Sequence, residues 1–576
     1  MLLVICTRSE TDIIPAFEAV VPSSNLGGCT KFRTLIINFL NMDQNSQNLT
    51  TKIPKEVSQV TSKLEAGGFQ VYLVGGCVRD LLMGKEPKDW DLTTNAKPEQ
   101  IVALFEKTVY ENDFGTVGVC VPAIALAKDG VSLGNSSTNV IRETNKVGVS
   151  RETQSEHVSR ITSNGVEYVL IEVTPYRTEA KYTDFRHPDG VEYSDSLEDD
   201  LKRRDFTVNA MVMDTKGEVK DLYGGITDIK DKVLRTVGEA DERFREDALR
   251  MLRAVRFSAQ LNFSISSETT ESILKNSELI KNISIERIRD EFVKIILSDN
   301  PASGIVLLQK FNLLKNFIPE LEQGIGCDQS GAHIYDVYDH LLHALQHAAD
   351  KDWPLEIRLA ALFHDIGKPK TRRLANGNGS KKYTFYGHEV VGARMAQKIM
   401  ERMKFPKKET DLAVSLVRNH MFFSDTELIT LSAVRRIIAK VSKENIWLLM
   451  NIRECDRVGM NKKEAPYRLR KYFAMIEEAL HDPISVSQLK IDGAYLINML
   501  HMKPGPRMGW ILNTLLEEVL ENPKLNTIEV LKDKVLELNN LSDMELKKLG
   551  EKAKETKEEL EEKEVEKLHV KHGVRK

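Results

Sequence analysis

The spacing of apolar and polar residues divides this chain into a mixed N-terminal part and a helical C-terminal part. Within residues 53–222, short apolar runs typical of strands, at 71–74 and 168–174, alternate with helix-like segments. From Asp241 onward the pattern predicts no further strand, and apolar residues recur at helical spacing. The sequence therefore predicts the α+β class, with a head of mixed β-sheet and helices followed by an all-α body.

Three segments lack this periodicity. Residues 127–164 are rich in Ser, Thr, Asn and Gly, which predicts a long surface insertion between two strands of one sheet. Residues 1–52 show no clear period, and Met42 precedes a polar stretch, so we expect a disordered leader or a start upstream of the true one. Residues 541–576 are rich in Lys and Glu, which is typical of a solvated helix or a frayed extension.

Composition narrows the class of protein. A chain of 576 residues is too long for one core, so we expect several domains. The net charge of -4 means that contact with nucleic acid would depend on local basic patches. The six cysteines are scattered and form no Cys-x-x-Cys pair, which argues against a zinc ribbon or a disulfide framework. Because no apolar run is typical of a spanning helix or a secretory signal, the sequence predicts a cytoplasmic protein that does not enter a membrane.

The first candidate site joins a glycine turn to two carboxylates. Gly75 and Gly76 permit close approach of a ligand, and a helix that starts there would present N–H groups to a triphosphate. Asp89 and Asp91 are spaced to share one face of a strand, where both could bind the same magnesium ions. Glu172, in the later predicted strand, could supply a third carboxylate, although an ordinary outward-facing residue is an equally good interpretation.

The second cluster lies in residues 200–211. The planar guanidinium of Arg204 could bind phosphate through two N–H groups, while Asp205 and Asn209 could bind ribose hydroxyls. A salt-bridged turn would explain the cluster equally well.

The third cluster lies on a predicted helix, where Asp247 and Arg250 are three residues apart and Arg253 continues the row. A carboxylate beside a guanidinium offers an acceptor next to a donor, which suits cytosine and adenine and rejects uracil and guanine. The alternative interpretation is an intrahelical salt bridge. Arg256 lies nearer the apolar side of this helix, which indicates a structural role.

Together, these segments resemble the class II tRNA nucleotidyltransferase and poly(A) polymerase family, and most closely its bacterial CCA-adding members. The matching segments are 73–80, 89–91, 172–174, 203–210, 221–225 and 246–250. The resemblance implies that Asp89 and Asp91 bind magnesium and act in catalysis with Glu172. It implies contact with the nucleotide for Gly76, Arg79, Arg204, Asp247, Arg250, Arg253 and Arg256. For Arg256, this conflicts with the interpretation from helical spacing.

A member of this family would add or repair the 3′-terminal CCA of tRNA from CTP and ATP, with Mg²⁺ as cofactor and tRNA as partner. Two alternatives remain within this class of enzyme. One is a poly(A) polymerase, which Ala248 and the segment at 114–117 make the poorer match, and the other is an enzyme that adds only CC or only A. The predicted parts are a leader at 1–52, a nucleotidyltransferase head at 53–222, a helical nucleotide- and RNA-binding neck at 223–320, an HD domain at 321–480, a tRNA-binding tail at 481–540 and a charged extension at 541–576. The sequence predicts no oligomeric state.

A second candidate site resembles the HD-type metal phosphohydrolases. His364 and Asp365 are adjacent at a predicted helix end, and an imidazole beside a carboxylate suits a divalent metal. The resemblance points to these metal ligands: His340, His364, Asp365 and His388, with His420 and Asp456 further along the chain. An active site for 2′,3′-cyclic or terminal phosphates on RNA and an inactive structural scaffold are equally good interpretations. In a third interpretation of the whole chain, it is chiefly an HD phosphohydrolase whose head only binds RNA.

Overall fold

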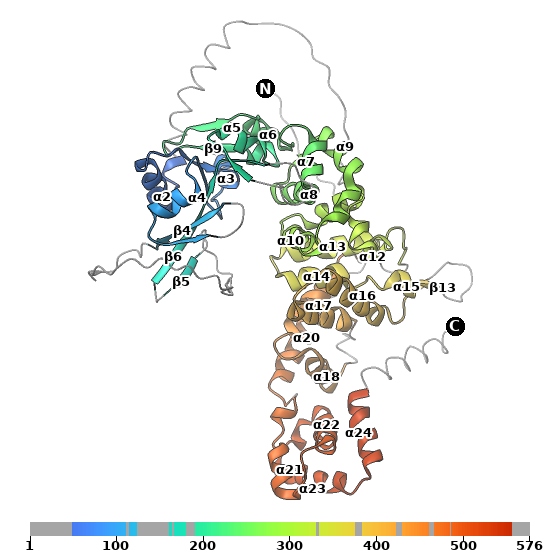
Figure 1. The fold of residues 1–576 in the computed structure, drawn as a ribbon. Helices are drawn as coiled ribbons and strands as arrows, with labels where there is room; N and C mark the ends of the chain where they lie inside the picture. Colours follow the sequence, from blue (N-terminus) through green and yellow to red (C-terminus); the bar gives the residue numbers. More distant parts are fainter. Residues whose placement is uncertain are drawn as a thin grey trace, which may run out of the picture.

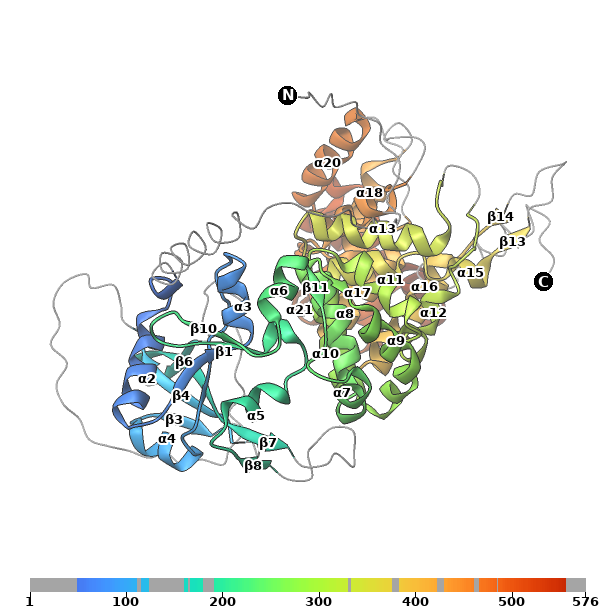
Figure 2. The same ribbon diagram turned by 90° about the horizontal axis from the view of Figure 1, so that it is seen from above.

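The computed structural model is an elongated column of helices, with a head at one end and a smaller helical tail at the other (Figure 1). Seen from above, the head lies beside the first helices of the column (Figure 2). The structure describes residues 49–110, 115–123, 160–163, 166–179, 191–329, 333–374, 383–421, 429–459, 466–483 and 485–555. The predicted leader, apart from its last four residues, lies outside these ranges.

The head contains one mixed sheet. Its main row of strands is β10 (Val219–Asp221), β9 (Met211–Met213), β1 (Val71–Val74), β2 (Asp91–Thr94), β6 (Val166–Pro175), β4 (Val117–Pro122) and β3 (Thr108–Tyr110), and β5 (Arg160–Ser163) pairs with β6. One face shares an apolar core with α2 (Lys55–Ala66), α3 (Gly76–Leu82) and α4 (Pro98–Leu104). On the other face, Val74 and Val212 pack against Leu201 of α5 (Leu197–Lys202). The second face is therefore covered only in part by the described residues.

Strands β2 and β6 are parallel neighbours in the middle of this sheet, and β4 and β5 are antiparallel to β6. The predicted insertion lies between β4 and β5, so its expected place between two strands of one sheet is confirmed. Its predicted end was wrong, because residues 160–163 form β5 and pair with β6. Residues 124–159 lie outside the described ranges.

The neck and the body share one continuous core, which runs from Phe206 to Leu520. The neck helices are α6 (Gly225–Asp231), α7 (Ala240–Glu246), α8 (Leu249–Leu261), α9 (Ser267–Asn276), α10 (Ile285–Ile296), α11 (Pro301–Lys310) and α12 (Pro319–Glu322). The body helices are α13 (Val337–Asp350), α14 (Leu355–Phe363), α15 (Lys368–Thr371), α16 (His388–Arg402), α17 (Lys407–Asn419), α18 (Leu431–Val441), α19 (Ile446–Asp456) and α20 (Pro466–Leu480). Ile288, Phe292 and Ile295 of α10 are buried at helical spacing, as expected for a helix with one apolar face.

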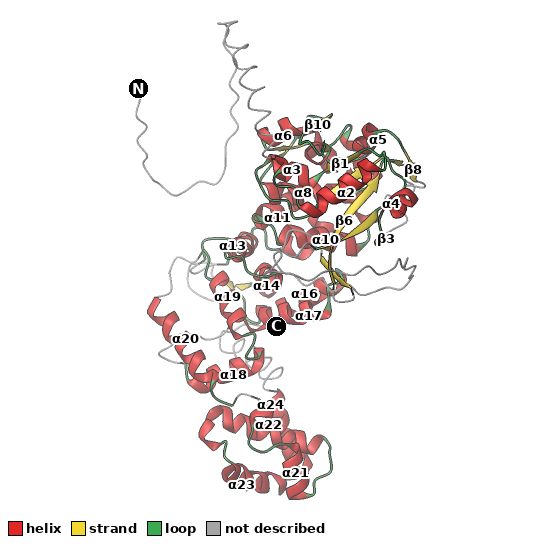
Figure 3. Ribbon diagram, turned by 90° about the vertical axis from the view of Figure 1, so that its left-hand side faces the viewer, coloured by secondary structure: helices red, strands yellow, loops and turns green. Residues whose placement is uncertain are grey.

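The predicted α+β class, with a mixed sheet in the head and helices in the body, is confirmed (Figure 3). The expectation of no strand after Asp241 was wrong in detail. Three strands of two residues each occur there: β12 (Ser264–Ile265), β13 (Arg373–Leu374) and β14 (Tyr383–Thr384). Because each is only two residues long, no run of alternating apolar residues marks it in the sequence.

The tail has its own core, formed by α21 (Gly493–Leu500), α22 (Pro506–Glu521), α23 (Ile528–Asn539) and α24 (Asp543–Glu555). It is joined to the body by Leu520 of α22, which packs in the body core, and by Arg435 of α18, which donates to the carbonyl of Leu520 at 3.0 Å and to Asp482 at 2.7 Å. Helix α24 confirms that the predicted charged extension begins as a helix; residues 556–576 lie outside the described ranges. None of the helices in the described ranges is both long and apolar enough to cross a membrane.

Candidate functional site

A glycine turn between β1 and α3 forms one edge of the predicted nucleotide site. Gly75 has a φ of 78°, a conformation that side chains other than glycine rarely adopt. A Cβ atom at Gly75 would lie 3.1 Å from Nη1 of Arg204, so any other residue would also displace this guanidinium by a few tenths of an ångström. Gly76 begins α3, and Arg79 follows three residues later on the same helix. The turn at Gly75 and Gly76 therefore lies beside Arg204, which is far from both glycines in sequence.

Two of the predicted carboxylates lie opposite each other on the neighbouring strands β2 and β6. Asp91 begins β2 and is the register partner of Glu172 in the parallel strand β6, so the two side chains share a face. Asp89 lies in the bend just before β2, so the argument from one strand face applies to Asp91 but not to Asp89. Trp90, between them, is buried in the core of the head.

The electrostatics of this face favour a cation. Burial raises the pKa of Asp91; the charge of Arg204 acts in the opposite direction, and the nearby charge of Asp89 raises the pKa further. A bound cation would relieve both the burial and the repulsion, since it stabilises the ionised form of each carboxylate. Asp89, Asp91 and Glu172 are oxygen donors, which are the ligands that Mg²⁺ prefers. The chemistry of this donor set suits a divalent ion of this kind, but the three carboxylates are not among the described groups whose ligand atoms lie within 4.8 Å of one another.

Asp200 connects the carboxylate strand to the arginines, and sequence reasoning assigned it no role. Its Oδ2 atom accepts from Thr93 of β2 at 3.2 Å and from Arg204 at 3.3 Å, while Oδ1 accepts from Arg203 at 2.6 Å. Burial opposes ionisation of Asp200, but Arg204 and Arg203 outweigh it and lower the pKa of this carboxyl group. The available signal was its spacing of three and four residues from Arg203 and Arg204, which places the side chains together if the segment is helical.

Four of the predicted nucleotide-binding residues form one chain of hydrogen bonds. Nη1 of Arg79 donates to Asn209 at 2.6 Å, and the amide of Asn209 donates to Asp205 at 3.2 Å. Asp205 also accepts from Nε of Arg253 at 2.7 Å. Burial opposes the ionisation of Asp205, but Arg253 and Asn209 outweigh it and lower the pKa to about 2. The chain links α3 in the head to α8 in the neck.

The expected placement of Asp247 beside Arg250 on one helix is wrong. Asp247 has extended backbone angles and lies between α7 and α8, where its Oδ1 atom accepts from the backbone N–H of Leu249 at 3.0 Å. Its Oδ2 atom pairs with Arg287 of α10 at 2.7 Å. Arg250 instead donates to Glu246 at 2.7 Å and to the carbonyl of Arg203 at 3.0 Å. This bond from the N–H two residues on is typical of a turn that aspartate favours, and the helical row breaks at this turn between α7 and α8.

Arg256 lies inside the neck. Its side chain is buried, donates to Glu291 of α10 at 3.1 Å and lies 4.2 Å from the centre of the Phe257 ring. Burial and the neighbouring charge of Arg253 lower the pKa of Arg256 to about 10, even though Glu291 acts in the opposite direction. These contacts agree with the interpretation from helical spacing.

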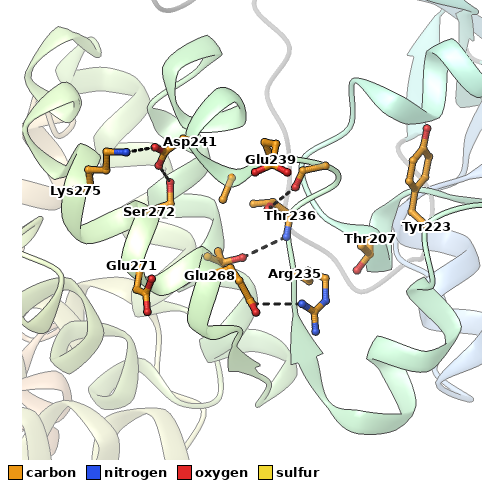
Figure 4. A pocket seen from close by; sticks show the side chains of 13 residues that line it. Thr207, Tyr223, Arg235, Thr236, Glu239, Asp241, Glu268, Glu271, Ser272 and Lys275 are labelled. Carbon is orange, nitrogen blue, oxygen red and sulfur yellow. Dashed lines mark hydrogen bonds and ion pairs between the residues drawn. The ribbon is translucent and has the colours of Figure 1, made fainter.

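A polar pocket of about 500 Å³ opens where the head meets the neck (Figure 4). Its lining includes Thr207 from the head, Tyr223 at the start of the neck, and Glu268 and Lys275 from α9. Lys275 and Ser272 hold Asp241 on one side of the pocket. None of the predicted site residues belongs to the described residues that line this pocket, so the pocket is distinct from the carboxylate site.

The second candidate site gathers six side chains from helices of the body and their ends. Two groups have ligand atoms within 4.8 Å of one another: His340, His364, Asp365 and Asp456, and Asp365, His388 and His420. Asp365 belongs to both groups. The structure therefore brings together the four predicted ligands and the two residues noted further along the chain.

The packing around Asp365 fixes these side chains. Nε2 of His340 and Nε2 of His364 are 3.1 Å apart, and Nε2 of His388 lies 3.1 Å from Oδ1 of Asp365. The Nδ1 atoms of three histidines lie within hydrogen-bonding distance of backbone carbonyls, those of Ala361 for His364, Phe385 for His388 and Val417 for His420. Bonds of this kind orient Nε2 toward a ligand. Gly367 allows the close approach of α16, because a Cβ there would lie 2.3 Å from the carbonyl of His388.

The charges in this cluster also suit a metal. Burial alone would lower the pKa of His364, but Asp365 and Asp456 outweigh it and raise the pKa to about 10. Burial opposes ionisation of Asp365, but Lys368 and His364 hold its pKa well below the usual range. Among the described residues, no hydrogen bond satisfies the buried Oδ1 of Asp365 or the Nε2 atoms of His388 and His420. Unsatisfied buried ligand atoms that converge on one point fit a divalent cation.

Comparisons with known proteins agree with the order of these sites along the chain. The model of the Poly A polymerase head domain matches residues 71–128 and 122–235, that of the "Probable RNA and SrmB- binding site of polymerase A" matches 262–325, and that of the HD domain matches 337–461. A CCA-adding enzyme of Ligilactobacillus salivarius is 31% identical over 480 residues, which cover 83% of this chain and 95% of that relative. The chain belongs to the family of CCA-adding enzymes.

Another member of the family is more similar over a shorter stretch, and a solved member has a similar fold. The CCA-adding enzyme of Lactobacillus delbrueckii subsp. bulgaricus strain ATCC BAA-365 is 40% identical over 247 residues, which cover 43% of this chain and 51% of that relative. The crystal structure of the Bacillus stearothermophilus CCA-adding enzyme in complex with CTP superposes with a TM-score of 0.58 at 25% identity, over 84% of this chain and 97% of that one. The predicted family is thus confirmed, and the chain is of the nucleotidyltransferase type.

Proposed function

We propose that this protein adds or repairs the 3′-terminal CCA of tRNA without a template, using CTP and ATP. The observation that carries the proposal is the pairing of Asp91 with Glu172 across β2 and β6, next to the Gly75 turn and Arg204. Nucleotidyl transfer requires carboxylates that can bind metal ions, next to a backbone turn and arginines that can bind the phosphates. Membership of the CCA-adding family and a neighbour solved with CTP support the same reaction.

In this reaction, the 3′ hydroxyl of tRNA attacks the α-phosphate of the nucleotide, and pyrophosphate leaves. Asp89 and Asp91 hold Mg²⁺, which when bound activates the hydroxyl and stabilises the leaving pyrophosphate. Glu172 completes the carboxylate group from β6. Gly76 and Arg79 at the start of α3, with Arg204, hold the triphosphate, and Asp200 keeps Arg204 in place.

Base selection belongs to the neck in this proposal. Asp247 and Arg250 present an acceptor and a donor to the base from the start of α8, each held by a different partner. Asp205, Asn209 and Arg253 keep the base-reading end of α8 against the head, and Arg256 holds α8 against α10. Among the predicted parts of the chain, residues 223–320 are the nucleotide-binding neck, and the tail at 481–540 contacts tRNA far from the reacting end.

One assay separates this proposal from its alternatives. Purified protein is incubated with tRNA lacking its 3′ terminus and with each labelled nucleotide in turn. Addition of two C residues and one A supports full CCA addition; A alone on any RNA indicates a poly(A) polymerase, and C alone indicates partial activity. Asp89→Ala should abolish incorporation without changing the melting temperature. Retained incorporation in Asp89→Ala would refute the role of the carboxylates.

A specific observation favours a second function, a metal-dependent phosphohydrolase in the HD domain. The two ligand groups that share Asp365 offer places for two divalent ions, with Asp365 between them. Two metals about 4 Å apart can hold both the attacking and the leaving oxygen of a phosphate ester. Substrates with a 2′,3′-cyclic or terminal phosphate on RNA would suit such a site, whereas a structural scaffold would not require all six side chains.

The second function has its own test. His364→Ala with Asp365→Ala should remove metal-dependent hydrolysis of 2′,3′-cyclic nucleotides while CCA addition continues. If the wild-type protein loaded with Mg²⁺, Mn²⁺, Ni²⁺ or Co²⁺ hydrolyses none of these substrates, the HD domain is a scaffold and the proposal of a second activity is wrong.

The place of action that fits these functions is the cytoplasm. The described cysteines, Cys77, Cys120, Cys327 and Cys455, are all buried and form no disulfide with one another, and burial raises the pKa of Cys77 to about 12. Thiols of this kind suit a reducing compartment. Mass spectrometry of the native protein for disulfides in cell extract would test this.

A further inference from the structure

We propose that Arg287 of α10 is a positioning residue for nucleotide selection, because it fixes the carboxylate of Asp247. This inference rests on the proposed nucleotidyltransferase function and adds to it a residue outside the predicted site. Sequence reasoning paired Asp247 with Arg250 instead. The geometry separates these two residues and gives Asp247 a partner from another helix.

Asp247 is held at both oxygens. Oδ1 accepts from the backbone N–H of Leu249 at 3.0 Å, and Oδ2 accepts from Nη2 of Arg287 at 2.7 Å. The side chain of Asp247 is 17% exposed and that of Arg287 26% exposed, so the pair lies at the edge of the neck with one side accessible. Each carboxylate oxygen has a second lone pair, which leaves an acceptor for a base. The two bonds therefore fix the direction in which Asp247 presents that acceptor.

Helix α10 is a rigid support for this contact. Ile288 and Phe292 of α10 are buried in the continuous core of the neck and body. One turn after Arg287, Glu291 pairs with the buried Arg256 of α8 at 3.1 Å. Arg287 and Glu291, one turn apart on α10, thus hold Asp247, which lies just before α8, and Arg256 within α8. A guanidinium on such a helix is held in one orientation more firmly than a surface arginine would be.

The fixed orientation of the Asp247 carboxylate matters more for discrimination among nucleotides than for the affinity for CTP and ATP. Cytosine and adenine place an exocyclic amine where a carboxylate accepts, while uracil and guanine place a carbonyl oxygen there. A fixed carboxylate repels that oxygen, whereas a carboxylate free to rotate can turn away from it. Loss of Arg287 should therefore admit UTP and GTP while the enzyme keeps most of its use of CTP and ATP.

The test measures kcat and KM of Arg287→Gln for CTP and UTP on tRNA that lacks its 3′ terminus. The ratio of kcat/KM for CTP to that for UTP should fall about ten- to a hundred-fold, the range for groups that orient a binding side chain. The matched control is Arg289→Gln on the same helix, since Arg289 pairs with Asp290 at 2.8 Å and with the carbonyl of Lys404. This control should keep wild-type selectivity.

A double-mutant comparison distinguishes positioning from a general loss of structure. If Arg287 acts through Asp247, Arg287→Gln should have no further effect on selectivity in an Asp247→Asn background. Equal losses in both backgrounds, or unchanged selectivity in folded Arg287→Gln, would overturn the inference. If wild type incorporates no nucleotide at all, the proposed function fails instead, and that outcome is seen before any variant is made.

A second variant covers the case in which Arg287→Gln does not fold. Arg287→Lys keeps the charge, but a compact ammonium does not reproduce the directed N–H bond of the guanidinium. Its selectivity should lie between wild type and Asp247→Asn, with a melting temperature close to that of wild type. Wild-type selectivity in Arg287→Lys together with an unfolded Arg287→Gln would show that Arg287 only stabilises the fold.

Discussion

Asp205 connects the head to the neck. It lies just before the short helix Thr207–Asn209 of the head, donates nothing, and accepts from Asn209 in the head and from Arg253 in α8. Sequence reasoning selected Asp205, Asn209 and Arg253 for contacts with the nucleotide. Their contacts with one another could not be predicted, because they depend on how α8 packs against the head rather than on spacing along the chain.

The lowered pKa of Asp205 makes part of the stability depend on pH. A carboxyl group whose pKa falls from about 4 in the unfolded chain to about 2 when folded stabilises the fold above pH 4 by about 2 kcal/mol, and this is lost as pH falls toward 2. Asp205→Asn should therefore lower the free energy of unfolding at pH 7, and the difference from wild type should shrink between pH 4 and pH 2. Urea unfolding at each pH measures this. Asp231→Asn, an exposed site at the end of α6, is the control with little expected change.

Substitution of Gly75 tests the role of the glycine turn at the scale of single residues. Gly75→Ala and Gly68→Ala both place a side chain at positive φ, at 78° and 83°, which costs about 1–3 kcal/mol each. Only at Gly75 would the new Cβ approach Arg204, since nothing lies within 4 Å at Gly68. Both variants should lose a similar amount of stability, but only Gly75→Ala should raise KM for CTP and ATP. Equal KM values in the two variants would contradict a role for the turn in placing Arg204.

At the scale of elements, regular patterns were predicted well and helix breaks were not. The predicted strand at 168–174 corresponds to β6, and the register between β6 and β2 places Glu172 opposite Asp91. The prediction that Asp247, Arg250 and Arg253 lie on one helix was wrong, because it extended the helical period of 3.6 residues past the end of α7. Aspartate is common in turns, so the sequence allowed a break here, but an aspartate in a turn and one in a helix look alike without the tertiary fold.

The packing of α8 on α10 leads to a prediction of stability. Glu291→Ala would leave Arg256 buried without its carboxylate partner, which should cost about 3 kcal/mol. The double variant Arg256→Met with Glu291→Leu removes both charges and should recover most of this loss. Thermal and urea unfolding of the two variants measure the difference. A double variant as unstable as Glu291→Ala would show that packing around Phe257, rather than the unpaired charge, is responsible.

The HD cluster shows the limit of sequence spacing at the same scale. Only His364 and Asp365 are adjacent, and the other four ligands are spread from His340 to Asp456. Family resemblance, not periodicity, selected them. Periodicity could not select them, because the ligands come together only where the ends of α13, α14, α16, α17 and α19 meet. That meeting point depends on how the five helices pack.

On the scale of the whole molecule, α18 and α22 join the body to the tail. Arg435 reaches across to Asp482 and to the carbonyl of Leu520, and Arg436 pairs with Glu517 at 3.3 Å. These contacts hold the tail core in a fixed place relative to the body. A long RNA that touches both the head and the tail would depend on this placement, whereas a single nucleotide would not.

Loosening this junction should therefore affect tRNA more than nucleotides. Arg435→Met should raise Kd for full-length tRNA about ten-fold while KM for CTP stays the same. An RNA limited to the acceptor stem is the comparison substrate, because it is too short to reach the tail and its affinity should not change. Equal losses for both RNAs would mean that Arg435 stabilises the body rather than the placement of the tail.

The pairing of β2 with β6 also bears on how the molecule folds. Thr93 and Thr174, hydrogen-bonded between these strands, are 81 positions apart, and the segment at 124–159 lies in the chain between them. The parallel pair can form only after this long loop closes, so contact between Asp91 and Glu172 is expected late in folding. Because closure entropy rises by only about 0.6 kcal/mol for each doubling of loop length, the insertion slows this step little. The head can therefore carry a long insertion between its strands without losing the alignment of its carboxylates.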